Sequence, residues 1–246
     1  MSSIVPKPIC RGQEIMAENW NTGKVAHVVD GPAGTGKTTF ALLLALDAVM
    51  NKRNQRQILI CRNSVATRDL GFLPGTLEEK MAPFFDIYGP IIDQVLGRAA
   101  SDKMIEKGIV SFCSTSFLRG RTFDNCVIIL DETQNLTYHE IETVITRVGQ
   151  NSKIIILGDY DQADSRSDDY YEWISRATKQ PALFTFTTLD HDDIVRSGFV
   201  ADYLRYNSIS RRPIVREMII RNTSHGKPGI KPEYVSTLAQ TFIDSN

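Results

Sequence analysis

The stretch Gly31-Pro-Ala-Gly-Thr-Gly-Lys-Thr38 decides the fold of this chain. It matches the pattern G-x-x-x-x-G-K-[ST] at every fixed position. An apolar run ends at Asp30 just before it, and a helical pattern begins at Lys37, which gives the strand–loop–helix context that the pattern requires. The glycines let the backbone wrap a phosphate with N–H groups pointing inward, and the helix N-terminus adds partial positive charge. The stretch is therefore a P-loop.

A P-loop fixes the roles of its last residues. The lysine reaches the β- and γ-phosphates of a nucleotide, and the hydroxyl that follows it binds Mg²⁺. We therefore expect ATP and Mg²⁺ as cofactors, with Lys37 as a catalytic residue and Thr38 as a metal ligand. The residues expected to hold the nucleotide are Gly31, Pro32, Ala33, Gly34, Thr35, Gly36, Lys37, Thr38 and Thr39.

Two further apolar runs end in polar residues. Val127–Leu130 leads into the acidic pair Asp131 and Glu132, which is the Walker B arrangement. Asp131 is expected to hold the magnesium shell, directly or through water, and Glu132 to polarise the attacking water as general base. The run at 154–157 leads into a loop with Gln162, which we expect to sense the γ-phosphate, a plain surface loop being the alternative.

Apolar, β-branched runs alternate with helical patterns along the chain. This predicts an α/β fold: a mostly parallel sheet with helices on both faces. The expected strands are Val25–Val29, Gln57–Cys61, Ile109–Cys113, Cys126–Leu130, Lys153–Leu157 and Leu183–Thr187. The expected helices are Lys37–Met50, Leu77–Leu96, Tyr138–Val148, Asp169–Thr178 and Asp192–Tyr206. Gly and Pro interruptions between about 71 and 108 predict a helical insertion at the rim of the sheet.

The composition is that of an ordinary globular protein, with 42% hydrophobic and 23% charged residues. A chain of 246 residues can bury a large core without disulfides, and its four cysteines form no C-x-x-C pair. The start shows no signal peptide and no apolar run reaches membrane-spanning length, so we expect a cytoplasmic location and no membrane association. The net charge of −1 excludes no partner, because basic groups can cluster on one face.

The order of the motifs resembles a known family. A P-loop, then D-E-x-Q, then G-D-x-x-Q is the order of superfamily 1 helicases. Four stretches are similar to the PhoH family of P-loop ATPases, as a short, phage-type member: Gly71-Phe-Leu-Pro-Gly-Thr-Leu-Glu-Glu-Lys80, Phe117-Leu-Arg-Gly-Arg-Thr122, Asp131-Glu-Thr-Gln-Asn135 and Asp193-Ile-Val-Arg196.

The resemblance implies one RecA-like ATPase domain at 13–206, preceded by an arm at 1–12 and followed by a basic extension at 207–246. It also implies a helicase-like action on RNA or single-stranded DNA, by a hexameric ring of identical subunits. Because the chain has one P-loop, the arginine that completes each ATP site is expected from a neighbouring subunit. Arg196 is the first candidate and Arg166 the second, and a surface ion pair is the alternative for either.

The resemblance also assigns residues outside the P-loop. Gln13 has the spacing of the helicase glutamine that reads adenine, with an ordinary polar role as the alternative. Hydroxyls and arginines at strand ends can bind a nucleic-acid backbone without reading sequence. The residues expected to do so are Arg62, Asn63, Ser64, Thr115, Arg119 and Arg121, of which Arg121 is equally suited to a structural ion pair.

Three functions fit these motifs. The first is an ATPase that remodels RNA or single-stranded DNA, and the second is an ATP-dependent switch or assembly module that acts on a protein partner. The long insertion and the near-neutral charge are compatible with the second. The third, a small-molecule kinase, is disfavoured because Glu132 suits water activation better than phosphoryl transfer to a metabolite. The basic tail at 205–231 fits either a solvated arm or a nucleic-acid contact.

Overall fold

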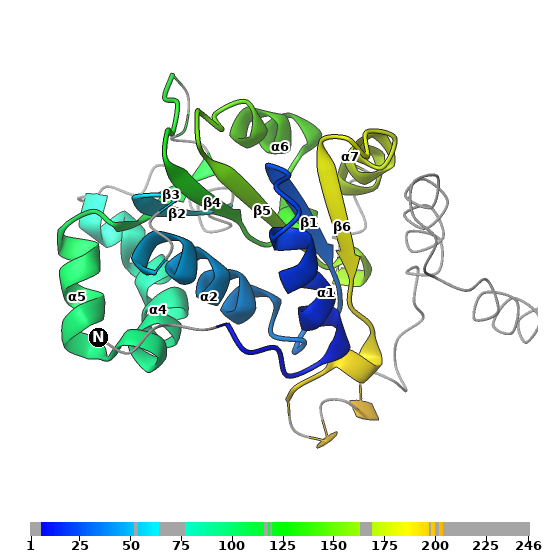
Figure 1. Cartoon of the computed structure of the whole chain (residues 1–246), viewed down its shortest axis with the longest axis horizontal. Coiled ribbons are helices and arrows are strands. Elements are labelled where there is room, and N and C mark those ends of the chain that lie inside the picture. The colour runs from blue at the N-terminus through cyan, green and yellow to red at the C-terminus, as the bar shows by residue number, and fades with distance from the viewer. Residues whose placement is uncertain are drawn as a thin grey trace, which may run out of the picture.

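The computed structural model describes residues 6–51, 54–63, 77–115, 118, 120–162, 169–196, 198–199 and 202–203, with the backbone alone for 77–85 and 161. Six strands form one sheet in the order β3-β2-β4-β5-β1-β6, and every neighbouring pair is parallel (Figure 1). The strands are β1 (Ala26–Asp30), β2 (Gln57–Arg62), β3 (Val110–Ser114), β4 (Cys126–Leu130), β5 (Lys153–Gly158) and β6 (Phe184–Thr188). The helices are α1 (Arg11–Trp20), α2 (Lys37–Met50), α4 (Leu77–Leu96), α5 (Arg98–Glu106), α6 (Tyr138–Ile145) and α7 (Asp169–Ala177). Short 3-10 turns are η2 (Thr133–Asn135), η3 (Tyr160–Gln162) and η4 (His191–Asp193).

The sheet is covered on both faces because its strands are apolar on both sides. Helices α1, α2, α4 and α5 cover one face of the sheet, and α6 and α7 cover the other (Figure 1). On β4, Val127 and Ile129 belong to the apolar core of the first face, whereas Ile128 and Leu130 belong to the core of the second. The P-loop strand β1 and the acid-bearing strand β4 are separated by β5. This is the arrangement of RecA-like P-loop ATPases, and it confirms the predicted α/β fold with a helical insertion, formed here by α4 and α5.

The predicted strands are confirmed to within one residue at each end, and so are three of the helices, Lys37–Met50, Leu77–Leu96 and Asp169–Thr178. The helix predicted at Tyr138–Val148 begins at Tyr138 and ends earlier, at Ile145. The helix predicted from Asp192 is wrong at its start, because Asp192 lies in the 3-10 turn η4 and the chain is extended at Ile194. Helix α1 was not predicted, and it spans the expected boundary between arm and domain. The extension at 207–246 lies outside the described residues. Among the described residues, no helix combines the length and the apolar character of a membrane span.

Leu189, which follows β6, packs closely against two glycines. Its side chain is buried, and a Cβ added to Gly12 or Gly31 would lie 2.6 or 2.7 Å from it. Its backbone N–H donates to the carbonyl oxygen of Asp30 at 2.8 Å. Only glycine permits this approach, so the start of α1 and the start of the P-loop both contact the chain after β6.

Asp193 continues this connection. Its carboxylate accepts the N–H of Gly12 in the first turn of α1 at 2.7 Å, and the N–H of Asp190 at 3.0 Å. Two residues later, Val195 donates its N–H to the carbonyl oxygen of Gly34 at 3.0 Å. Because the N–H of Val195 donates to the P-loop and not to a carbonyl oxygen of the preceding turn, no helix runs from residue 192 through Val195. Residues 189–196 therefore hold α1 and the P-loop together.

Replacing Asp193 with alanine is expected to lower the free energy of unfolding by about 1–3 kcal/mol, because the buried N–H of Gly12 loses a charged acceptor at a helix start. Urea unfolding followed by circular dichroism measures the change. The matched control is Asp192→Ala, an exposed neighbour in the same turn, for which a change within about 0.5 kcal/mol is expected. Equal losses in both variants would contradict the role given to Asp193.

Candidate nucleotide site

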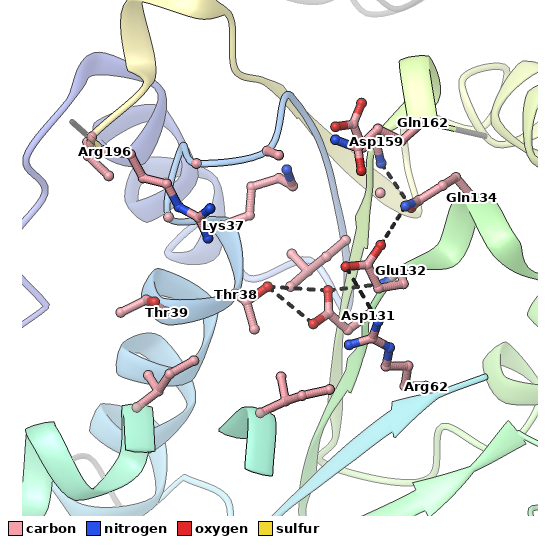
Figure 2. A pocket seen from close by; sticks show the side chains of 18 residues that line it. Lys37, Thr38, Thr39, Arg62, Asp131, Glu132, Gln134, Asp159, Gln162 and Arg196 are labelled. Atoms are coloured by element: carbon pink, nitrogen blue, oxygen red, sulfur yellow. Dashed lines mark hydrogen bonds and ion pairs between the residues drawn. The ribbon is translucent and has the colours of Figure 1, made fainter. Parts of the chain in front are cut away.

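A cavity of about 490 Å³ opens beside the carboxyl ends of the central strands (Figure 2). This is the edge at which open α/β sheets bind ligands, and the volume suits a small molecule. The cavity brings together eleven residues predicted from the sequence: Ala33, Gly34, Gly36, Lys37, Thr38, Thr39, Arg62, Asp131, Glu132, Gln162 and Arg196.

The P-loop presents backbone donors to this cavity. Gly34 and Gly36 have φ angles of 85° and 74°, a left-handed conformation that glycine adopts at little cost. The N–H groups of residues 34–36 donate to no acceptor in the described part of the chain, and helix α2 begins directly after them. Unpaired N–H groups at a helix N-terminus are the donor set that binds phosphate, so the loop fits this ligand.

Two cationic side chains lie at the same end of the cavity. The Nζ of Lys37 donates to the carbonyl oxygens of Gly31 and Pro32 at 2.6 and 2.9 Å. Arg196 lies over the P-loop, and its Cδ is 3.2 Å from the position of a Cβ on Gly34. Its guanidinium points into the cavity near Lys37 (Figure 2). The structure thus places Arg196 in the cavity of its own chain.

Thr38 and Asp131 form the candidate magnesium site. The Oγ1 of Thr38 lies 3.3 and 3.2 Å from the two carboxylate oxygens of Asp131 (Figure 2). Asp131 also accepts hydrogen bonds from the hydroxyl of Tyr88 at 2.9 Å and from the N–H of Glu132 at 3.0 Å. Burial raises the pKa of Asp131, and the charge of Glu132 raises it further. A divalent cation favours the ionised carboxylate, and hard oxygen ligands suit Mg²⁺, so these residues fit the ion.

Glu132 is held in place by hydrogen bonds. Its φ of 54° is unusual for a residue other than glycine. The Nε2 of Gln134 donates to its Oε2 at 2.6 Å, and the Oε1 of Gln134 accepts the N–H of Asp159 at 3.0 Å. Arg62 approaches the other carboxylate oxygen to 3.9 Å. Glu132 thus faces the cavity, in which the exposed Gln162 also lies.

Gln13, the residue predicted to read adenine, lies against the P-loop. It is buried, its Nε2 donates to the carbonyl oxygen of Thr35 at 3.0 Å, and its Oε1 accepts the N–H of Ile9 at 3.1 Å. It is not among the residues that line the cavity. In this structure its amide joins α1 to the P-loop.

The residues predicted to bind nucleic acid are dispersed. Arg62 lies in the nucleotide cavity, Asn63 and Thr115 are buried, and the guanidinium of Arg121 lies 5.2 Å from the ring centre of Phe123. They form no shared exposed surface among the residues that the structure describes. Ser64, Arg119 and Arg166 lie outside the described residues.

Sequence reasoning missed three residues that shape the cavity. Gln134 belongs to the motif Asp131–Asn135 and Asp193 to the motif Asp193–Arg196, so the sequence marked both residues as candidates although it indicated no role for them. Tyr88 had none, because it lies in the insertion, forty-three residues before Asp131 and outside any motif.

Comparisons with known proteins match these observations. The model of the PhoH-like protein family matches residues 5–207. The chain is 40% identical over 206 residues to the PhoH-like protein of Synechocystis sp. (strain ATCC 27184 / PCC 6803 / Kazusa), covering 82% of this chain and 58% of that protein. It is 40% identical over 134 residues to the PhoH-like protein of Bacillus subtilis (strain 168), covering 54% and 42%. The chain thus spans about half the length of these relatives.

Among solved structures, the large terminase from a thermophilic bacteriophage superimposes with a TM-score of 0.49 at 12% identity. The match covers 82% of this chain and 51% of that chain.

Proposed function

This chain belongs to the PhoH-like protein family, and on that premise we propose that it binds ATP with Mg²⁺ and hydrolyses it to act on RNA or single-stranded DNA. Family membership supports nucleotide binding in the cavity. The observation that carries hydrolysis is the convergence of Lys37, the Thr38–Asp131 pair and Glu132 in one cavity.

Binding relies on the P-loop and the metal site. The N–H groups of residues 34–36 and the ammonium of Lys37 bind the β- and γ-phosphates. Thr38 and Asp131 hold Mg²⁺, directly or through water. Bound Mg²⁺ supplies charge neutralisation at the phosphate oxygens.

Hydrolysis relies on Glu132, Gln162 and Arg196. Glu132 accepts a proton from the water that attacks the γ-phosphorus, while the bond to the β-phosphate oxygen breaks and leaves ADP. Gln162 lines the cavity from η3, the turn that follows β5, where it can orient that water or the γ-phosphate. Arg196 stabilises the negative charge on the transferred phosphoryl group.

Action on a nucleic-acid strand is supported by the helicase-like motif order and by Arg62. This arginine stands at the carboxyl end of β2, a position predicted to bind phosphate, and also lies 3.9 Å from Glu132. A bound RNA or DNA strand that draws Arg62 toward its phosphates removes positive charge from beside Glu132, the general base. Strand binding and turnover are coupled through this pair.

A hexameric ring remains part of the proposal on the strength of the family resemblance. The physical reason for it, an arginine supplied by a neighbour, is weakened because Arg196 lines the cavity of its own chain. Light scattering of the purified chain with and without ATP measures the assembly.

Single-stranded RNA or DNA is expected to raise ATP turnover several-fold, and the stimulation is expected to fall steeply between about 50 and about 200 mM salt, since backbone contacts release counterions. Steady-state phosphate release measures both effects. Lys37→Ala serves as the control for a contaminating ATPase. Turnover that does not respond to either strand at low salt would contradict this proposal and would favour an ATPase that acts on a protein partner.

A further inference from the structure

Helix α4 of the insertion contacts the candidate magnesium site through one buried side chain. Tyr88 has no exposed surface, and its hydroxyl donates to the Oδ2 of Asp131 at 2.9 Å. Its ring stacks on Phe112 of β3 with ring centres 5.9 Å apart and an angle of 20° between the planes. The ring is therefore fixed by packing, and the hydroxyl is fixed with it.

The hydrogen bonds around Asp131 are nearly complete. A carboxylate offers about four lone-pair positions. Tyr88 donates to Oδ2, Glu132 donates its N–H to Oδ1, and the hydroxyl of Thr38 lies within reach of both oxygens. The carboxylate thus keeps about one position for a metal ion or its water. When the Thr38 oxygen turns to a metal ion, Tyr88 and the Glu132 N–H are the two donors that still orient Asp131.

The same turn of α4 forms part of the cavity wall. Ile87 and Ile91, which flank Tyr88 on this helix, line the cavity, and Ile87 is 42% exposed. A displacement of α4 therefore alters the wall and the hydrogen bond to Asp131 together.

We propose that Tyr88 is a positioning residue of the magnesium site, which orients the Asp131 carboxylate toward the metal shell and makes metal binding depend on the placement of α4. The inference rests on the proposed function, because it requires a nucleotide and a metal ion in this cavity. Hydrogen-bonding partners of metal ligands contribute about 10–100-fold to metal affinity or activity in other proteins.

The test is Tyr88→Phe, which keeps the stacked ring and removes only the hydroxyl. We expect the affinity of the protein–ADP complex for Mn²⁺, measured from the electron paramagnetic resonance of free Mn²⁺, to fall about 10-fold. The Mg²⁺ concentration for half-maximal ATP turnover should rise by a similar factor. Nucleotide affinity measured in EDTA should stay at the wild-type value, because the buried Tyr88 is not among the residues that line the cavity.

Tyr170→Phe is the matched control. Tyr170 is also fully buried, and its hydroxyl donates to the carboxylate of Asp30 at 3.3 Å, on the opposite face of the sheet. Its removal should leave Mn²⁺ affinity within about 2-fold of wild type, because it orients no residue of the metal site. A fall in Mn²⁺ affinity confined to Tyr88→Phe supports the positioning role.

Three results would overturn the inference. A Mn²⁺ affinity of Tyr88→Phe equal to that of the wild type would contradict the positioning role. A loss of Mn²⁺ affinity in Tyr170→Phe as large as that in Tyr88→Phe would contradict it as well. Loss of nucleotide binding in EDTA shows that Tyr88 maintains the cavity as a whole. Failure of the wild-type chain to bind any nucleotide is a different result, because it overturns the proposed function itself.

Discussion

Replacing Glu132 with glutamine is expected to leave ATP bound while lowering turnover by about 10²–10⁴-fold. Glutamine has the size of glutamate, but its amide does not accept a proton from the attacking water. The Nε2 of Gln134, now 2.6 Å from the carboxylate, can still donate to the carbonyl oxygen of the new side chain. The fold of the loop is therefore kept, and the loss falls on the chemical step.

Equilibrium binding of ATP and single-turnover hydrolysis separate the two effects in Glu132→Gln. The matched control is Glu172→Gln, an exposed glutamate on α7 whose partner is the exposed Arg176, and wild-type behaviour is expected for it. Lys37→Ala should show the opposite pattern, with the loss in ATP affinity. Turnover of Glu132→Gln at the wild-type rate would exclude Glu132 as the general base.

The sheet and the phosphate end of the cavity could be predicted because their signals are local. The strand Cys126–Leu130 is buried along its whole length, so its apolar run has clear limits and its last residue places Asp131 at the edge of the sheet. The P-loop pattern carries both the glycines and the helix start within eight residues. Parallel pairing then brings these two motifs together without further information.

Other features depend on contacts between distant segments, and the sequence does not indicate them. Helix α1 was missed because its buried face consists of Gly12, Gln13, Met16 and Trp20, of which only two are apolar. The roles of glycine and glutamine there depend on the P-loop and on Leu189. A buried glycine or amide adds no apolar side chain to the pattern, so only Met16 and Trp20 mark the buried face of α1 in the sequence.

Substitution of Arg196 is also expected to lower ATP turnover strongly. An arginine that stabilises the charge of the transferred phosphoryl group raises turnover by about 10³–10⁵-fold in other P-loop enzymes. Arg196→Ala is expected to lower turnover by about 10³-fold with little change in the folded structure, since the side chain is exposed. Arg196→Lys should recover only part of the loss, because lysine keeps the charge without the planar fork of the guanidinium. Arg176→Ala, which removes an exposed arginine of α7 that does not line the cavity, is the control and should keep wild-type turnover.

Mixing two inactive variants decides in which subunit Arg196 acts. The bond from the Val195 N–H to the Gly34 oxygen fixes the backbone beside Arg196 on its own P-loop, and the side chain covers Gly34 of the same chain. An Arg196→Ala subunit and a Lys37→Ala subunit each lack one required group in their own cavity. Their mixture should therefore stay inactive even in an assembled oligomer. Recovery of phosphate release on mixing would show that Arg196 reaches the nucleotide of a neighbouring subunit. Each ATP site would then need an arginine from the next subunit, which is the physical argument for a ring.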